Sequence, residues 1–203
     1  MNRKAIIYVH GKGGCADEAG HYSSLFPDSD VLGFDYHSAT PWEAKEEFTA
    51  YFDEISKRYA SVQLIANSIG AYFSMNALNS GCIERAYFIS PIVNMQKLIC
   101  DMMLWAGVTE EQLKEKGTVE TAFGETLSWE YLSWVRNNQL IWDVPTAILR
   151  GGGDNLQSDE TIREFAVKTG AEITVMENGE HWFHTEEQMA FLDAWIKQVA
   201  AAL

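Results

Sequence analysis

Three polar residues of the types that form a hydrolytic relay are spread along the chain. Ser68 lies in the segment Ala66–Gly70, Asp154 ends a glycine-rich run, and His181 follows a glycine. A serine hydroxyl is a poor nucleophile unless a histidine accepts its proton, and a carboxylate must hold that histidine in the right tautomer. The three residue types therefore predict acyl transfer, provided that the fold brings them together.

The neighbours of Ser68 are small where a tight turn would require it. An apolar strand pattern, Val62–Ala66, precedes the serine, and an apolar helical pattern follows it. A nucleophile on a sharp strand-to-helix turn has a strained backbone, and the residues two before and two after it must be small. Ala66 and Gly70 meet this need, although glycine is usual at the first of these positions. The alternative is that Ser68 only caps the helix.

Asp154 is the expected acid of the relay because it directly follows the strand pattern Thr146–Leu149. The alternative for this residue is a solvated aspartate, since Gly and Asp are common in turns. Asp143 precedes the same strand and should lie at the wrong end of the sheet. Asp159 belongs to the first turn of an expected helix.

His181 is the expected base because it closely follows the last strand pattern, Ala171–Met176. His184 lies only three residues further on and is the rival. It is placed at the edge of the final helix, where a surface or capping role is expected. Chain order and loop position favour His181.

A glycine-rich loop, His10–Gly14, follows the first strand pattern. Acyl transfer needs hydrogen-bond donors for the negative charge that develops on the carbonyl oxygen. We expect these donors to be the backbone N–H groups of Ile69, directly after the nucleophile, and of Lys12 in this loop. A phosphate-binding loop is disfavoured because the pattern G-x-x-x-x-G-K-[ST] is absent. His10 is expected to brace the loop.

Strand patterns alternate with helical ones along the chain. This alternation predicts an α/β fold with a mostly parallel sheet of roughly six strands and helices on both faces. Ligands bind beyond the carboxyl ends of the strands in such sheets, and every candidate above follows a strand. The expected strands are residues 5–9, 30–35, 62–66, 85–89, 146–149 and 171–176.

Residues 92–143 differ in character from the rest of the chain. They are rich in Met, Trp, Glu and Leu and lack a clear strand pattern. We therefore expect a helical insertion between two parts of one core, residues 1–91 and 144–203. The expected helices span residues 95–105, 110–116 and 128–137, and the aromatic residues of interest are Trp105, Trp129, Trp134 and Trp142.

Composition limits the partners of the protein. The chain has 203 residues and a net charge of −14, a field that repels nucleic acid and anionic membrane surfaces. Three scattered cysteines do not form a disulfide framework and are typical of a reducing compartment. No apolar stretch approaches the roughly 20 residues that span a bilayer, and the first residues indicate a strand and not a targeting segment. A cytoplasmic location without membrane insertion is expected.

The order Ser68, Asp154, His181 is that of the α/β-hydrolases. The sequence resembles this superfamily over nearly its whole length, from the His10–Gly14 loop to the helix after His181. The resemblance implies an α/β-hydrolase fold in a minimal version, similar to small esterase-like members. It also implies that residues 92–143 form a small helical cap over the site.

Together these features predict a serine hydrolase that forms an acyl-enzyme on Ser68. The expected substrate is a carboxylic ester or thioester with a small to medium, largely uncharged acyl group, although the same relay serves other acyl chemistry. The alternative is a non-catalytic, hydrolase-like protein that binds a ligand or partner. No metal or organic cofactor is needed, a small molecule is the expected partner, and the oligomeric state is left open.

Overall fold

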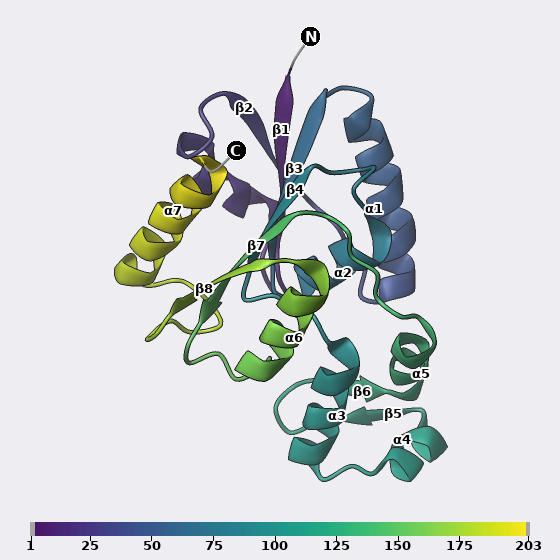
Figure 1. Cartoon of the computed structure of the whole chain (residues 1–203). Coiled ribbons are helices and arrows are strands. Elements are labelled where there is room, and N and C mark those ends of the chain that lie inside the picture. Colours follow the sequence, from purple (N-terminus) through teal and green to yellow (C-terminus); the bar gives the residue numbers. More distant parts are fainter. Residues whose placement is uncertain (1–2, 202–203) are drawn as a thin grey trace. The chain divides into compact units, whose positions relative to one another are not determined.

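The computed structural model describes residues 3–201, which form two compact units (Figure 1). The core unit comprises residues 3–93 and 141–201, and the second unit comprises Asn94–Leu140. Residues at both junctions are tied to the core unit: the Val93 N–H donates to Gln157 Oε1 at 3.1 Å, and Trp142 Nε1 donates to Thr146 Oγ1 at 2.7 Å. Trp142 therefore belongs to the core unit, and its expected place in the insertion was wrong.

Six parallel strands form the sheet of the core unit, in the order β2-β1-β3-β4-β7-β8. This arrangement confirms the expected sheet. The first strand begins one residue earlier than expected, at Lys4. The apolar runs are nearly fully buried in the four central strands, as expected for strands covered on both faces. The strands are β1 (Lys4–Val9), β2 (Ser29–Phe34), β3 (Ser61–Asn67), β4 (Arg85–Ile89), β7 (Thr146–Gly151) and β8 (Glu172–Met176).

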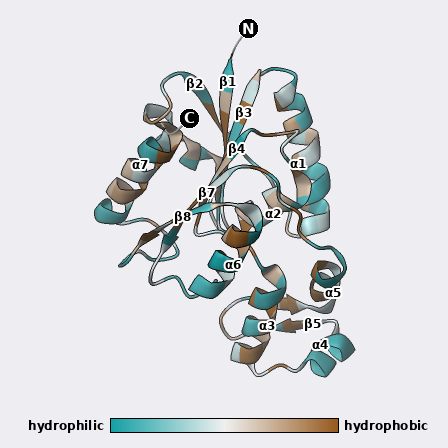
Figure 2. Cartoon of the chain, in the orientation of Figure 1, coloured by the Kyte–Doolittle hydropathy of each residue, from teal (hydrophilic) through white to brown (hydrophobic). Residues whose placement is uncertain are grey.

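Helices lie on both faces of this sheet (Figure 1). One face packs against a 3₁₀ helix, η1, and the last helix, α7, through Tyr22 and Trp195. Helices α1 and α2 pack together on the other face, where the rings of Phe48 and Phe73 lie 6.3 Å apart. Figure 2 shows polar and apolar residues alternating along α1 and α7, so each helix has one face suited to the sheet. The helices of the core unit are η1 (Ala16–Ser24), α1 (Pro41–Ser56), α2 (Ile69–Ala77), α6 (Asp159–Thr169) and α7 (Glu186–Ala201).

Local capping signals set the helix boundaries. Thr40 accepts from the Glu43 N–H, and the Glu43 carboxylate accepts from the Thr40 N–H, which satisfies both groups at the start of α1. Ser158 caps α6 through its side chain, which accepts from the Thr161 N–H. Gly170 ends α6 in the left-handed conformation, with φ of 75°, which glycine adopts without steric cost.

The second unit combines three helices with a small hairpin. Its helices lie where the sequence predicts them: α3 (Met95–Ala106), α4 (Glu110–Lys116) and α5 (Trp129–Asn137). The antiparallel pair β5 (Thr118–Glu120) and β6 (Thr126–Ser128) was not expected. Strands of three residues are too short for an apolar alternation to be read from the sequence.

Within residues 3–201, no helix combines the length and the apolar character required to cross a bilayer.

Candidate active site

Ser68 stands on the sharp turn between β3 and α2. Its backbone has φ of 50° and ψ of −120°, a conformation that side-chain-bearing residues rarely adopt. Neighbouring strand ends hold the turn in place: the Ser68 N–H donates to the Ile89 carbonyl at 3.0 Å, and the Ile92 N–H donates to the Ser68 carbonyl at 3.1 Å. The turn raises the hydroxyl above the carboxyl edge of the sheet.

Small residues allow this turn to sit against the first loop. A Cβ atom on Gly70 would lie 2.4 Å from the His10 carbonyl oxygen, so no larger residue fits there without backbone movement. On the other side of the serine, a Cβ atom on Gly11 would lie 3.2 Å from Ser68 Cβ. Ala66 is fully buried at the position where glycine is usual.

The loops after β7 and β8 approach each other closely. A Cβ atom on Gly151 would lie 2.3 Å from the Gly179 carbonyl oxygen, so this contact requires glycine. Two backbone hydrogen bonds join the loops: Gly152 N–H to Met176 O at 2.8 Å and Gly153 N–H to Gly179 O at 2.9 Å. The glycine run thereby brings the residues that follow each strand, Asp154 and His181, into contact.

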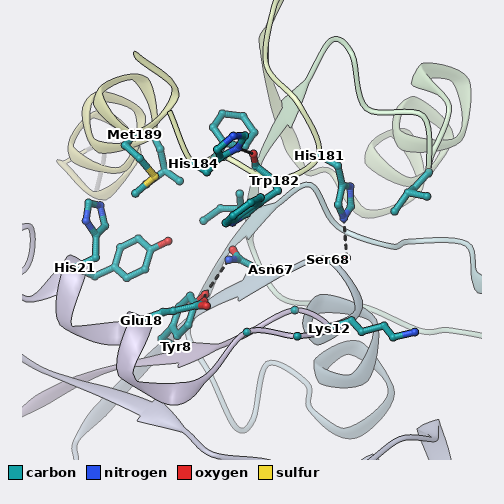
Figure 3. A pocket seen from close by; sticks show the side chains of 18 residues that line it. Tyr8, Lys12, Glu18, His21, Asn67, Ser68, His181, Trp182, His184 and Met189 are labelled. Atoms are coloured by element: carbon teal, nitrogen blue, oxygen red, sulfur yellow. Dashed lines mark hydrogen bonds between the residues drawn. The ribbon is translucent and has the colours of Figure 1, made fainter. Parts of the chain in front are cut away.

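The structure brings Ser68, Asp154 and His181 together. His181 Nε2 lies 2.8 Å from Ser68 Oγ, and His181 Nδ1 lies 2.8 Å from Asp154 Oδ2 (Figure 3 shows the first contact). Because an ionised carboxylate only accepts, Nδ1 carries the proton and Nε2 can accept from the serine hydroxyl. The other Asp154 oxygen accepts from the Leu156 N–H at 2.9 Å. The Asp154 side chain is 3% exposed and that of His181 is 26% exposed.

His184, the rival base, faces a different set of groups. Its Nδ1 lies 2.8 Å from the Trp182 carbonyl oxygen and 3.5 Å from Glu180 Oε2. Its ring stacks on the Trp182 indole with centroids 4.4 Å apart. Figure 3 places His184 beside Trp182 at the same cavity, on the side away from Ser68.

The rival acids are engaged elsewhere. Asp143 accepts from the Ser80 hydroxyl at 2.6 Å, a hydrogen bond that lowers the pKa of its carboxyl group. Asp159 accepts from Arg163 at 2.5 Å and from Arg150 at 2.8 Å, and the bond from Arg163 lowers the pKa of Asp159. Asp154 is thus the candidate acid that contacts the histidine.

The two backbone positions expected to bind the carbonyl oxygen lie at the start of α2 and in the loop after β1. Ile69 is the first residue of α2, where a backbone N–H has no partner within the helix. Lys12 lies in the loop after β1 and lines the cavity next to Ser68. His10 braces this loop: its ring stacks on Tyr36 with centroids 4.3 Å apart, and the Tyr36 hydroxyl donates to its carbonyl oxygen at 2.9 Å.

A cavity of about 810 Å³ opens beside the serine within the core unit. This volume suits a small organic molecule. Among residues 3–201, no group of three or more His, Cys, Asp or Glu side chains is placed to hold a metal. The apolar side chains that line the cavity are Ile89, Leu156, Trp182, Phe183, Met189 and Leu192.

One polar cluster in this cavity escaped the sequence analysis. Asn67 Nδ2 donates to the Tyr8 hydroxyl at 2.8 Å, and that hydroxyl donates to the Glu18 carboxylate. Burial raises the pKa of Tyr8, so the phenol stays protonated and acts as a donor. Glu18 lies on η1, which has no strong sequence signal, so no sequence pattern linked Glu18 to the cavity.

The comparisons with known proteins bear on the fold. A scan against protein-family profiles and a comparison with curated proteins both give no match. Solved structures do match. Alpha/beta hydrolase domain-containing protein 10 from mouse has a TM-score of 0.79 at 12% identity, over 98% of this chain and 90% of its own. Est1E from Butyrivibrio proteoclasticus has a TM-score of 0.76 at 16% identity, over 98% and 87%.

A third structure, an esterase from Pyrococcus furiosus, matches with a TM-score of 0.61 at 18% identity, over 98% of this chain and 81% of its own. Because the sequence identities are this low, these matches show only that the architecture is shared. The chain has the α/β-hydrolase fold, as the resemblance in the sequence implied.

Proposed function

We propose that the protein is a serine hydrolase that cleaves carboxylic esters or thioesters through an acyl-enzyme on Ser68. One observation carries the proposal. His181 bridges Ser68 Oγ and Asp154 Oδ2 with two contacts of 2.8 Å, at the edge of the sheet where α/β proteins bind ligands. The esterase among the structural neighbours is consistent with this activity.

Each proton in the reaction has a defined carrier. Ser68 Oγ attacks the carbonyl carbon while His181 Nε2 accepts the hydroxyl proton, and Asp154 stabilises the imidazolium that forms. The imidazolium then gives that proton to the leaving alcohol or thiol as the carbon–oxygen or carbon–sulfur bond breaks. Water repeats the sequence on the acyl-enzyme, releasing the acid and restoring Ser68.

The negative charge on the carbonyl oxygen needs donors that are in place before the reaction. The Ile69 N–H at the start of α2 is one, and the positive end of the helix dipole adds to it. The Lys12 N–H, from the loop packed against Ser68, is the second donor in this proposal.

The apolar lining of the cavity favours a small to medium, largely uncharged acyl group. Leu156, Phe183 and Met189 offer apolar contact, and the cavity volume of about 810 Å³ limits the size of the whole substrate. The second unit remains a candidate cap in this proposal, as the resemblance implied.

Labelling with a fluorophosphonate probe tests this function. We expect one phosphonate per chain, mapped to Ser68 by peptide mass spectrometry, because only an activated serine attacks such probes. Denatured protein serves as the control and should not react. An intact protein that stays unlabelled would instead support the non-catalytic, ligand-binding alternative.

Asp154→Asn is expected to lower kcat by about 10⁴-fold while the fold persists. The amide can donate to His181 Nδ1, which would place the remaining proton on Nε2, where it blocks acceptance from Ser68. Steady-state hydrolysis of p-nitrophenyl butyrate measures the loss, with Asp143→Asn as the matched control at full rate. A near-normal rate in Asp154→Asn would assign the acid to another residue.

A further inference from the structure

Among the described residues that line the cavity, Glu18 is the only carboxylate. Its hydrogen-bond partner is a neutral phenol, Tyr8, and no cation forms an ion pair with it within residues 3–201. Two histidines of the cavity face other carboxylates. His21 lies 2.7 Å from Asp193, and His184 lies 3.5 Å from Glu180. Glu18 thus places a carboxylate in the cavity that forms no ion pair within residues 3–201, and Lys12 is the lysine that lines the same cavity.

The hydrogen-bond chain Asn67–Tyr8–Glu18 fixes the direction of each donor. The Tyr8 hydroxyl has a single proton, which it gives to the carboxylate, so its oxygen must accept from the Asn67 amide. That leaves Asn67 Oδ1, a buried acceptor without a partner among the described residues. The Tyr8 proton and one N–H of Asn67 are thus used within the cluster, and its charged end, the Glu18 carboxylate, acts as an acceptor.

The surroundings of Glu18 are also suited to a cation. The rings of Tyr8 and Tyr22, with centroids 5.3 Å apart, line the same cavity and carry no charge that would oppose a cation. The net charge of −14 favours the approach of cations and disfavours anions. Figure 3 places Glu18 and Tyr8 in the same cavity as Ser68 and His181, on the side toward His21.

From this arrangement we propose that Glu18 determines specificity, selecting esters that carry an ammonium group away from the ester bond. The proposal rests on the hydrolase function proposed above and adds one positive charge to an otherwise uncharged substrate. Glu18 binds the substrate in this account and takes no part in the proton transfers at Ser68.

Two matched ester pairs test the proposal on the purified full chain. In the first, p-nitrophenyl 5-(trimethylammonio)pentanoate is compared with its carbon isostere, p-nitrophenyl 6,6-dimethylheptanoate. In the second, butyrylcholine is compared with 3,3-dimethylbutyl butyrate by proton release. The pairs place the charge on the acyl and the alcohol side, respectively, and the ratio of kcat/KM within a pair cancels differences in active protein.

We expect the cationic ester to be preferred in one pair, and Glu18→Gln to lower that ratio by about tenfold, a modest factor because the carboxylate is open to solvent. Asp17→Asn is the matched control: it removes the same charge from an exposed neighbour that does not line the cavity, and should keep the wild-type ratio. Tyr8→Phe removes the group that orients the carboxylate and should lower the ratio too.

Wild-type ratios near or below one in both pairs would overturn the proposal, as would a preference equal in Glu18→Gln and wild type. A Glu18-dependent preference for p-nitrophenyl 6-hydroxyhexanoate over the cationic ester would overturn it in favour of a neutral donor. In each of these results the neutral esters are still cleaved. Failure of the hydrolase function is a different result, in which no ester is cleaved and the phosphonate probe does not react.

Discussion

His181→Ala is expected to lower kcat for p-nitrophenyl butyrate by about 10⁶-fold, to a residual rate of ester hydrolysis that does not use the triad. Without the imidazole, the Ser68 proton has no acceptor, since Asp154 contacts the histidine and not the serine. Steady-state kinetics on freshly purified protein, with thermal melting to verify the fold, measures this effect.

His184→Ala is the matched control for this experiment. It removes the same side chain from a position three residues away, where the ring stacks on Trp182 and the Nδ1 atom faces the Trp182 carbonyl. Most of the activity should remain, with changes confined to KM because His184 lines the cavity. The opposite outcome, an active His181→Ala and an inactive His184→Ala, would transfer the role of base to His184.

Ser68→Ala and Ser68→Gly are both expected to abolish turnover by about 10⁶-fold, since neither has an oxygen that can attack. Their stabilities should differ. At φ of 50°, alanine keeps the backbone strain of the serine, whereas glycine adopts this region readily. We expect Ser68→Gly to melt about 2–4 °C above Ser68→Ala, corresponding to about 1 kcal/mol.

This pair of variants separates loss of chemistry from loss of structure. A folded Ser68→Gly protein that is as stable as wild type and inactive assigns the activity to the hydroxyl. Wild-type turnover in either folded variant would remove Ser68 from the nucleophile role and leave the non-catalytic interpretation. Equal melting temperatures would show that the turn stores no strain at this residue.

Much of the fold could be predicted because a strand that is buried on both faces has a continuous run of apolar residues. Ile6 and Ile7 are both buried although they point to opposite faces of the sheet, and such apolar runs indicate parallel strands. Helix starts also carry local signals, such as Pro41 at the first position of α1 and Ser158 at the cap of α6. The hairpin of the second unit and η1 could not be predicted in this way. Three-residue strands and a 3₁₀ helix are too short to produce a recognisable hydrophobic periodicity.

For the site, the sequence supplied residue types and their order, which sufficed to nominate Ser68, Asp154 and His181. It could not measure the contacts among them. Those depend on loops from β3, β7 and β8 meeting at one edge, and on Gly151 passing close to the Gly179 carbonyl. Chain position favoured His181 over His184, and the contact of the His181 ring with Ser68 depends on how the loops fold.

By itself, the sequence determined which residues follow strands, because apolar periodicity is a local property of the chain. The tertiary structure alone decided which of those residues touch. Glu18 illustrates the difference most clearly: nothing within its own segment links it to Tyr8, 10 residues away, or to Asn67, which lies 59 residues from Tyr8. Long-range contacts of this kind arise from packing η1 against the sheet, and no local pattern records them.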